Sequence, residues 1–142
     1  MADPRAASPV ARPLAVAKVR VQAMADTDTA WVRLVFRYLA WATGWLVFGT
    51  LVGEYLGVKF VAPDVEHVPW LSFGRLRHVH TNTVFWGWSS LAMISMALYV
   101  VPKTSRCRLH SFPLAYLSLW LVNAAVLVCN VLLMMGISNG SQ

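Results

Sequence analysis

The sequence predicts an all-α membrane protein with three transmembrane helices. Of its 142 residues, 58% are hydrophobic and only 13% are charged, and the mean hydropathy is +0.56. The apolar residues are gathered into three long blocks, whereas a soluble core would spread them at regular spacing. Each block can supply the roughly 20 apolar residues that a helix needs to cross a bilayer.

The segment before the first block, residues 1–30, is predicted to be a disordered basic cytoplasmic tail. It is rich in alanine, proline and arginine and has no long apolar run. Pro4, Pro9 and Pro13 interrupt it, and no small-residue cleavage site follows a hydrophobic stretch, as it would in a signal peptide. The membrane region is therefore expected over residues 31–142.

The three helices are expected near residues 31–58, 76–101 and 113–137. The first begins with tryptophans that suit the membrane interface, the second is expected to stop at Pro102, and the third carries no charged residue. In the first helix, Gly49-x-x-x-Gly53 matches a pattern that lets membrane helices pack closely, so this helix should approach a neighbour.

The positive charges predict the orientation of the chain. Nine of the 12 lysine and arginine residues lie in the tail, at the start of the first helix or in the loop after the second helix: Arg5, Arg12, Lys18, Arg20, Arg33, Arg37, Lys103, Arg106 and Arg108. This excess predicts that the N-terminus is cytoplasmic and that the helices are surrounded by membrane lipid. Because the charges form no single patch, the net charge of +6 does not indicate nucleic-acid binding.

The candidate functional residues lie where the second helix begins. His78 and His80 enter the membrane together with Arg75 and Arg77, and an ionisable group there is by default a functional hypothesis. Neutral imidazole binds haem iron, so His80 is a candidate ligand, with His78 as a weaker one. Arg77, one turn before His80, can pair with a haem propionate, and Arg75 is less well directed. Alternatively, the histidine only packs against a neighbouring helix, and the arginines only contact lipid phosphate.

Three further features, in the second helix, the first helix and the first loop, are candidates for a binding role. Gly87, on the same face as His80, would leave room for a flat macrocycle. Glu54, an acid at the outer end of the first helix, could join a cation site or a proton path, or simply remain solvated. In the first loop, the polar residues Asp64, Glu66 and His67 could bind a metal, although such loop residues are more often solvated.

The stretch Trp70-Leu-Ser-Phe-Gly-Arg-Leu-Arg-His-Val-His-Thr-Asn82, followed by a helix that ends in Tyr99-Val-Val-Pro102, resembles the start of subunit I of haem-copper oxidases. The C family, the cbb-type cytochrome c oxidases, is the most similar, and the nitric oxide reductases come next. The resemblance implies that the chain is the N-terminal fragment of a bundle of about twelve helices. In this family the histidine of the Arg-x-x-His-Thr-Asn motif is an axial ligand of low-spin haem b, which corresponds to His80, and the propionate-binding arginine corresponds to Arg77.

The resemblance also implies the rest of the machinery. The second axial ligand, the high-spin haem and the copper ligands would all lie downstream, so the fragment alone should not reduce oxygen. Family members bind calcium near a position that corresponds to Glu54 and Tyr55. The implied partners are the remainder of subunit I and c-type cytochrome subunits, which together pass electrons to an oxygen-reducing haem-copper centre in aerobic respiration, in the bacterial inner membrane. A nitric oxide reductase and a small cofactor-free membrane interaction or assembly protein are the alternatives.

Overall fold

The computed structural model describes residues 11–63 and 68–137, and within these ranges it contains helices and no strand. The chain divides into two units, Met1–Arg33 and Leu34–Gln142. The first unit contributes the N-terminal part of a long helix, α1 (Ala11–Val61). The second unit contains the rest of α1 and every other element, and it holds the candidate site.

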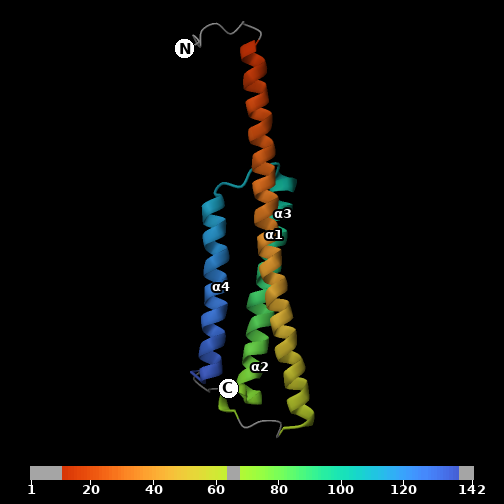
Figure 1. The fold of residues 1–142 in the computed structure, drawn as a ribbon, viewed down its shortest axis with the longest axis vertical. Coiled ribbons are helices and arrows are strands. Elements are labelled where there is room, and N and C mark those ends of the chain that lie inside the picture. The colour runs from red at the N-terminus through yellow and green to blue at the C-terminus, as the bar shows by residue number, and fades with distance from the viewer. Residues whose placement is uncertain (1–10, 64–67, 138–142) are drawn as a thin grey trace, which may run out of the picture. The chain divides into compact units, whose positions relative to one another are not determined.

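The elements after α1 form two more long helical segments. A short 3₁₀ turn, η1 (Pro69–Leu71), precedes α2 (Phe73–Asn82), which continues without a break through η2 (Thr83–Ser89) and α3 (Ser90–Ser105). The last helix is α4 (Phe112–Met135), which lies beside α2 and η2 in the second unit (Figure 1).

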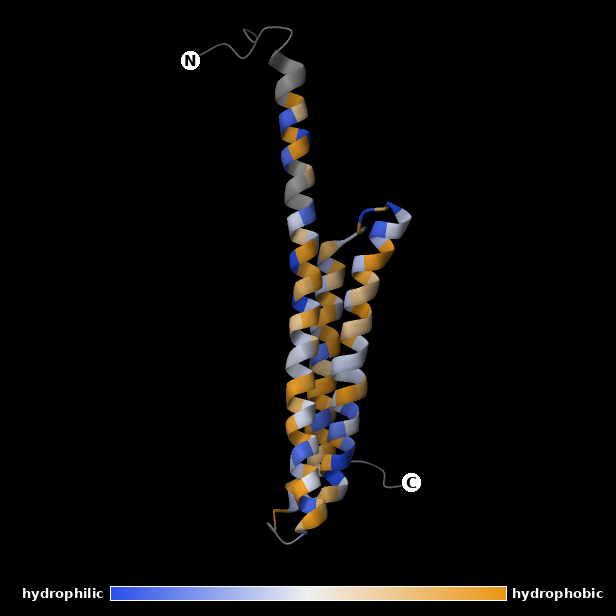
Figure 2. Ribbon diagram, turned by 90° about the vertical axis from the view of Figure 1, so that its right-hand side faces the viewer, coloured by the Kyte–Doolittle hydropathy of each residue, from blue (hydrophilic) through white to orange (hydrophobic). Residues whose placement is uncertain are grey.

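Three helical stretches are long and apolar enough to cross a membrane: Asp28–Val61, Phe73–Ser105 and Phe112–Met135. Large hydrophobic side chains are exposed along all three, and Figure 2 shows hydrophobic residues along much of their length. A large apolar surface is unfavourable in water, so these helices are suited to contact with lipid. The predicted fold class, an all-α membrane protein with three membrane helices, is confirmed.

The structure differs from the sequence prediction at the N-terminal side, where a disordered tail was expected up to residue 30. Helix α1 already begins at Ala11, and residues 1–10 lie outside the described part of the chain. After Pro13 this segment contains no proline or glycine, and it is rich in alanine and other residues that favour helix. Pro13 lies in the first turn, where its missing N–H has no intrahelical partner to lose.

The second difference concerns Pro102, which was expected to end the middle helix. Instead α3 continues past Pro102 to Ser105 and ends where Arg106 adopts a left-handed backbone conformation, with φ of 51°. Membrane helices tolerate a proline in this way because neighbouring groups and local adjustments can satisfy the freed carbonyl. Accordingly, the loop between α3 and α4 is shorter than the sequence predicted.

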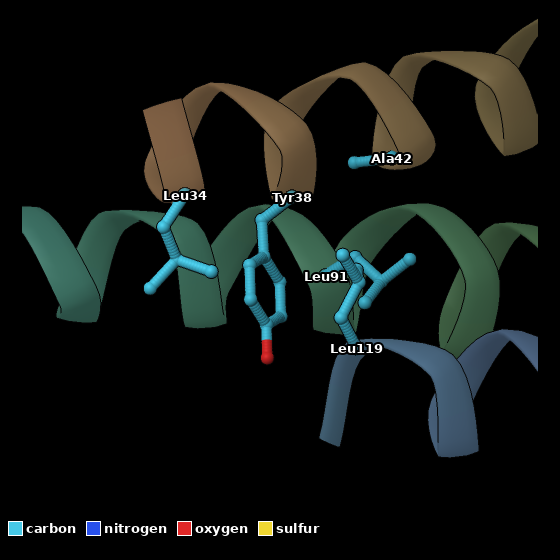
Figure 3. Close-up of a cluster of buried hydrophobic side chains, with 5 residues drawn as sticks. All are labelled: Leu34, Tyr38, Ala42, Leu91 and Leu119. Atoms are coloured by element: carbon cyan, nitrogen blue, oxygen red, sulfur yellow. The ribbon is translucent and has the colours of Figure 1, made fainter. Parts of the chain in front are cut away.

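The core of the second unit is formed by five buried side chains from three helices: Leu34, Tyr38, Ala42, Leu91 and Leu119 (Figure 3). The Tyr38 hydroxyl lies at 2.6 Å from both the carbonyl oxygen of Ala115 and the Ser118 Oγ, so this core residue also satisfies its polar atom. Such interhelical hydrogen bonds help to hold membrane helices together, since lipid provides no hydrophobic driving force between them.

The segment η2 has π-helical hydrogen bonding, and it changes which residues face the core. From Val79 onwards, the buried residues of the middle helix follow one another at intervals of four: Val79, Thr83, Gly87, Leu91 and Ser95. In a regular α-helix each four-residue step rotates by about 40° beyond a full turn, so these positions would drift across the surface. The wider π turn slows this rotation and keeps them on one face.

Candidate functional site

The start of α2 is tied to the end of α1 by a buried lysine. Lys59, in the last turn of α1, is only 6% exposed, and its Nζ donates a hydrogen bond to the carbonyl oxygen of Leu71 in η1. This contact closes the loop between the two helices. The histidines and arginines of α2 therefore lie beside the last turns of α1.

His80 is turned towards α1, whereas His78 is exposed. The Nδ1 atom of the His80 ring lies 2.7 Å from the carbonyl oxygen of Gly49. Because a carbonyl oxygen can only accept, the hydrogen bond assigns the imidazole proton to Nδ1. In the neutral ring, Nε2 then carries the lone pair that an imidazole needs to bind a metal ion.

The ring of His80 rests directly against Gly53. A Cβ atom at Gly53 would lie 3.1 Å from His80 Nδ1 and only 2.8 Å from His80 Cε1, and the second distance is shorter than real Cβ atoms show. Glycine at this position therefore lets the imidazole lie against the backbone of α1. The close packing predicted for the Gly49-x-x-x-Gly53 pattern is present, and its partner is the helix that carries His80.

Two further glycine contacts continue the same interface. Thr83 and Val84 each place a methyl group 3.2 Å from where a Cβ of Gly49 would lie. Gly87 receives the indole of Trp45, whose Cγ would be 2.7 Å from an added Cβ. The two antiparallel helices thus interlock, each placing large side chains over glycines of the other.

The room that Gly87 was expected to leave for a macrocycle is taken in this structure by Trp45. The indole is fixed there because Trp45 Nε1 donates a 2.7 Å hydrogen bond to Asn123 Oδ1 on α4. The expectation was wrong because the sequence shows an open position at a glycine but not which side chain of another helix fills it.

A set of polar side chains joins the middle helix to α4. Asn82 Nδ2 donates to Asn130 Oδ1 at 2.7 Å, and Asn130 Nδ2 donates to Thr83 Oγ1 at 2.9 Å. Both Asn130 and Thr83 are buried. This network was not predicted from the sequence. Two asparagines seven residues apart in an apolar helix, Asn123 and Asn130, do indicate a shared polar face.

The two arginines of α2 have different surroundings. Arg75 Nη1 donates to the carbonyl oxygen of Met134 at 3.2 Å, and the guanidinium lies against Gly136, where α4 ends with φ of 77°. Arg75 therefore stabilises the C-terminus of α4, where the helix dipole and the last carbonyls favour a cation. Arg77, one turn before His80, is exposed.

The residues expected near a calcium ion directly follow Gly53 in α1. Glu54 is exposed, while Tyr55 is half-buried, with Lys59 Nζ 5.4 Å from the centre of its ring. In the part of the chain that the structure describes, no three His, Cys, Asp or Glu side chains gather to hold a metal ion. The loop residues Asp64, Glu66 and His67 lie outside that part.

A separate groove of about 440 Å³ lies between the middle helix and α4, on residues other than the His80 contact. Its lining is mostly apolar and includes Asn82, Trp86, Ser90 and Cys129. The groove is therefore not the place where His80 would meet a ligand.

Comparison with known proteins then identifies what the chain resembles. The family model described as "Cytochrome C and Quinol oxidase polypeptide I" matches residues 33–142. The chain is 32% identical to a cytochrome c oxidase subunit 1 homolog from Agrobacterium tumefaciens (strain T37), over 69% of this chain and 18% of that protein. It is 29% identical to the Cbb3-type cytochrome c oxidase subunit CcoN1 of Stutzerimonas stutzeri, over 82% of this chain and 25% of that protein.

A second relative from Stutzerimonas stutzeri is named for a different activity. This nitric oxide reductase subunit of Stutzerimonas stutzeri is 34% identical over 62% of this chain and 18% of that protein. The chain thus spans between 18% and 25% of the length of these three relatives. No solved structure gives a significant match.

Proposed function

Since the chain belongs to the cytochrome c and quinol oxidase polypeptide I family, we propose that it supplies His80 as one axial ligand of a low-spin haem b. Its relatives identify it as a portion of subunit I of a haem-copper oxidase, a family that carries haem and copper. Of the two histidines in α2, His80 is the one whose ring is oriented by a backbone hydrogen bond.

The hydrogen bond from His80 to Gly49 is the observation that supports this proposal most strongly. Histidines that bind metal usually donate their second ring N–H to a carbonyl or carboxylate, which fixes the tautomer and the orientation of the ring. The 2.7 Å contact between Nδ1 and the Gly49 oxygen has this form. In such an arrangement Nε2 would bind the haem iron, and the haem would supply one-electron transfer.

Arg77 is the residue that we propose for binding a haem propionate. It lies one turn before His80 and is exposed, so its guanidinium can reach a carboxylate at the membrane surface. Arg75 is not included because its guanidinium already contacts the end of α4. The two arginines would then have separate tasks, one for the cofactor and one for the fold.

The rest of the proposed function depends on parts of subunit I other than the segment that this chain matches. The second axial ligand, the high-spin haem and the copper would be held by the remainder of subunit I. Electrons would arrive from c-type cytochrome subunits and continue to an oxygen-reducing centre. The nitric oxide reductase relative supports an alternative with nitric oxide as the substrate, since this chain is also 34% identical to that protein.

The proposal also includes a place and an orientation for the chain. Three apolar helices and the family indicate a multi-pass membrane protein, and we place it in the bacterial inner membrane with a cytoplasmic N-terminus. A calcium ion near Glu54 and Tyr55 would need further oxygen ligands from elsewhere, because calcium takes six to eight and Glu54 is the only carboxylate described in this region.

The proposal is tested by replacing each histidine of α2 in the assembled complex that contains this chain. His80→Ala should abolish the absorption band of the low-spin haem b in difference spectra of reduced and oxidised membranes. His78→Ala, two residues away and exposed, is the matched control and should keep the band. An unchanged band in His80→Ala would reject the ligand role and favour the cofactor-free assembly protein instead.

A further inference from the structure

We propose that Gly53 is a positioning residue that sets the rotation of the His80 imidazole about its bond to the haem iron. The inference rests on the proposed role of His80 as a ligand. Helix α1 supplies no haem ligand in the proposed function, and this inference gives it the role of orienting the ligand on α2.

The ring of His80 is held by α1 at two places. The carbonyl oxygen of Gly49 accepts from Nδ1 at 2.7 Å. One turn further along α1, the backbone of Gly53 lies so close to the ring that a Cβ there would be 2.8 Å from Cε1. The hydrogen bond to Gly49 directs Nδ1, and the backbone of Gly53 limits the ring on the side of Cε1, so the two contacts together restrict rotation of the imidazole plane.

The α1 surface that carries these contacts is itself held in place. Thr83 and Val84 pack against Gly49, and Trp45 packs against Gly87. The Trp45 indole is hydrogen-bonded to Asn123 of α4. Because large side chains meet glycines on both helices, a small shift of α1 relative to the middle helix would create clashes at several positions.

Orientation of the imidazole plane matters because groups around a metal ligand tune the metal that it binds. The direction of the ring determines how its π orbitals overlap with those of a low-spin haem iron, and this overlap affects both the electron paramagnetic resonance spectrum and the reduction potential. Gly53 would thus influence the haem without contacting it.

The test compares Gly53→Ala with Gly57→Ala in the assembled complex. The methyl group of Gly53→Ala would force the ring of His80 to move by more than half an ångström to reach the 3.4 Å of ordinary contact. A Cβ at Gly57, one turn further along the same helix, has nothing within 4 Å. We expect Gly53→Ala to keep the haem but to shift the g values of its low-spin signal and its reduction potential, and Gly57→Ala to match the unaltered protein.

Identical g values and potential in Gly53→Ala and Gly57→Ala would overturn the inference. If Gly53→Ala is not recovered in membranes, the unaltered complex is examined by electron–nuclear double resonance after transfer to D₂O. Slow exchange of the imidazole Nδ1 proton would support the packed ring, and exchange within the mixing time would contradict it. Retention of the low-spin signal in His80→Ala would contradict both the ligand role of His80 and this inference. Loss of that signal in His80→Ala, together with unchanged g values and potential in Gly53→Ala, would contradict this inference alone.

Discussion

The two histidines of α2 lie two residues apart, yet their surroundings differ completely. His80 is held by the carbonyl of Gly49 and the backbone of Gly53, whereas His78 is exposed. The same contrast separates Arg75, which contacts the end of α4, from exposed Arg77. On a helix, two residues of separation turn side chains to nearly opposite sides, so one member of each pair contacts another helix and the other member is exposed.

Replacing Arg77 should change the reduction potential of haem b. If its guanidinium lies near a propionate, Arg77→Gln removes a positive charge that stabilises the reduced haem, and the potential should fall by an amount on the order of tens of millivolts. Redox titration of the haem band measures this shift. Arg75→Gln is the control, because its charge is directed at α4; an equal fall in both variants would contradict the assignment.

At the scale of the helices, close packing depends on glycines opposite large side chains. Gly87→Ala should destabilise the bundle, because the new Cβ would lie 2.7 Å from Trp45 Cγ. Overpacking of this kind costs about 1–3 kcal/mol. Thermal unfolding of the purified complex should show a lower midpoint for Gly87→Ala and an unchanged one for Gly44→Ala, since nothing lies within 4 Å of a Cβ there. Equal midpoints for Gly87→Ala and Gly44→Ala would contradict this prediction, because they would show that the interface accommodates the added methyl group without loss of stability.

The polar network between the middle helix and α4 makes a second prediction at this scale. Asn130→Leu removes the partner of both Asn82 and Thr83. In membrane proteins such bonds contribute about 0.6–2 kcal/mol. We expect a lower midpoint for unfolding in detergent titrations while the haem spectrum stays unchanged, and a spectral change with normal stability would contradict a purely structural role.

The helices also show what sequence patterns could and could not predict. Three apolar blocks predicted three membrane helices, because the length needed to cross a bilayer is a strong constraint. The helical start at Ala11 was not predicted, because the prolines and basic residues before Trp31 are typical of a disordered tail, although alanine and other residues there favour helix. The π segment Thr83–Ser89 was also missed, since its hydrogen bonds depend on packing against α1 and α4 and leave no regular spacing in the sequence.

For the whole molecule, the positive charges predict that the N-terminus and the loop after α3 lie on the cytoplasmic side. Cys107 in that loop is exposed and can report on this orientation. A membrane-impermeant maleimide should label it in inverted vesicles but not in right-side-out vesicles. Cys107→Ser is the control for labelling of Cys129, and labelling of Cys107 only in right-side-out vesicles would reverse the topology.

The site as a whole was predictable only in part. The motif indicated His80 and Arg77, but not the contacts that distinguish them from His78 and Arg75, because those contacts come from the backbones of α1 and α4. The chain spans between 18% and 25% of its three compared relatives, so the opposite side of a haem site would come from other helices.

The ligand role of His80 is tested most directly by replacing the side chain and then supplying its ring in solution. His80→Gly removes the imidazole, and free imidazole can bind the iron in its place without repairing a packing defect in the protein. We predict that the low-spin signal of haem b is lost in His80→Gly membranes and returns when imidazole is added, while His78→Gly keeps the signal throughout. A low-spin signal that persists in His80→Gly without imidazole would contradict the proposal.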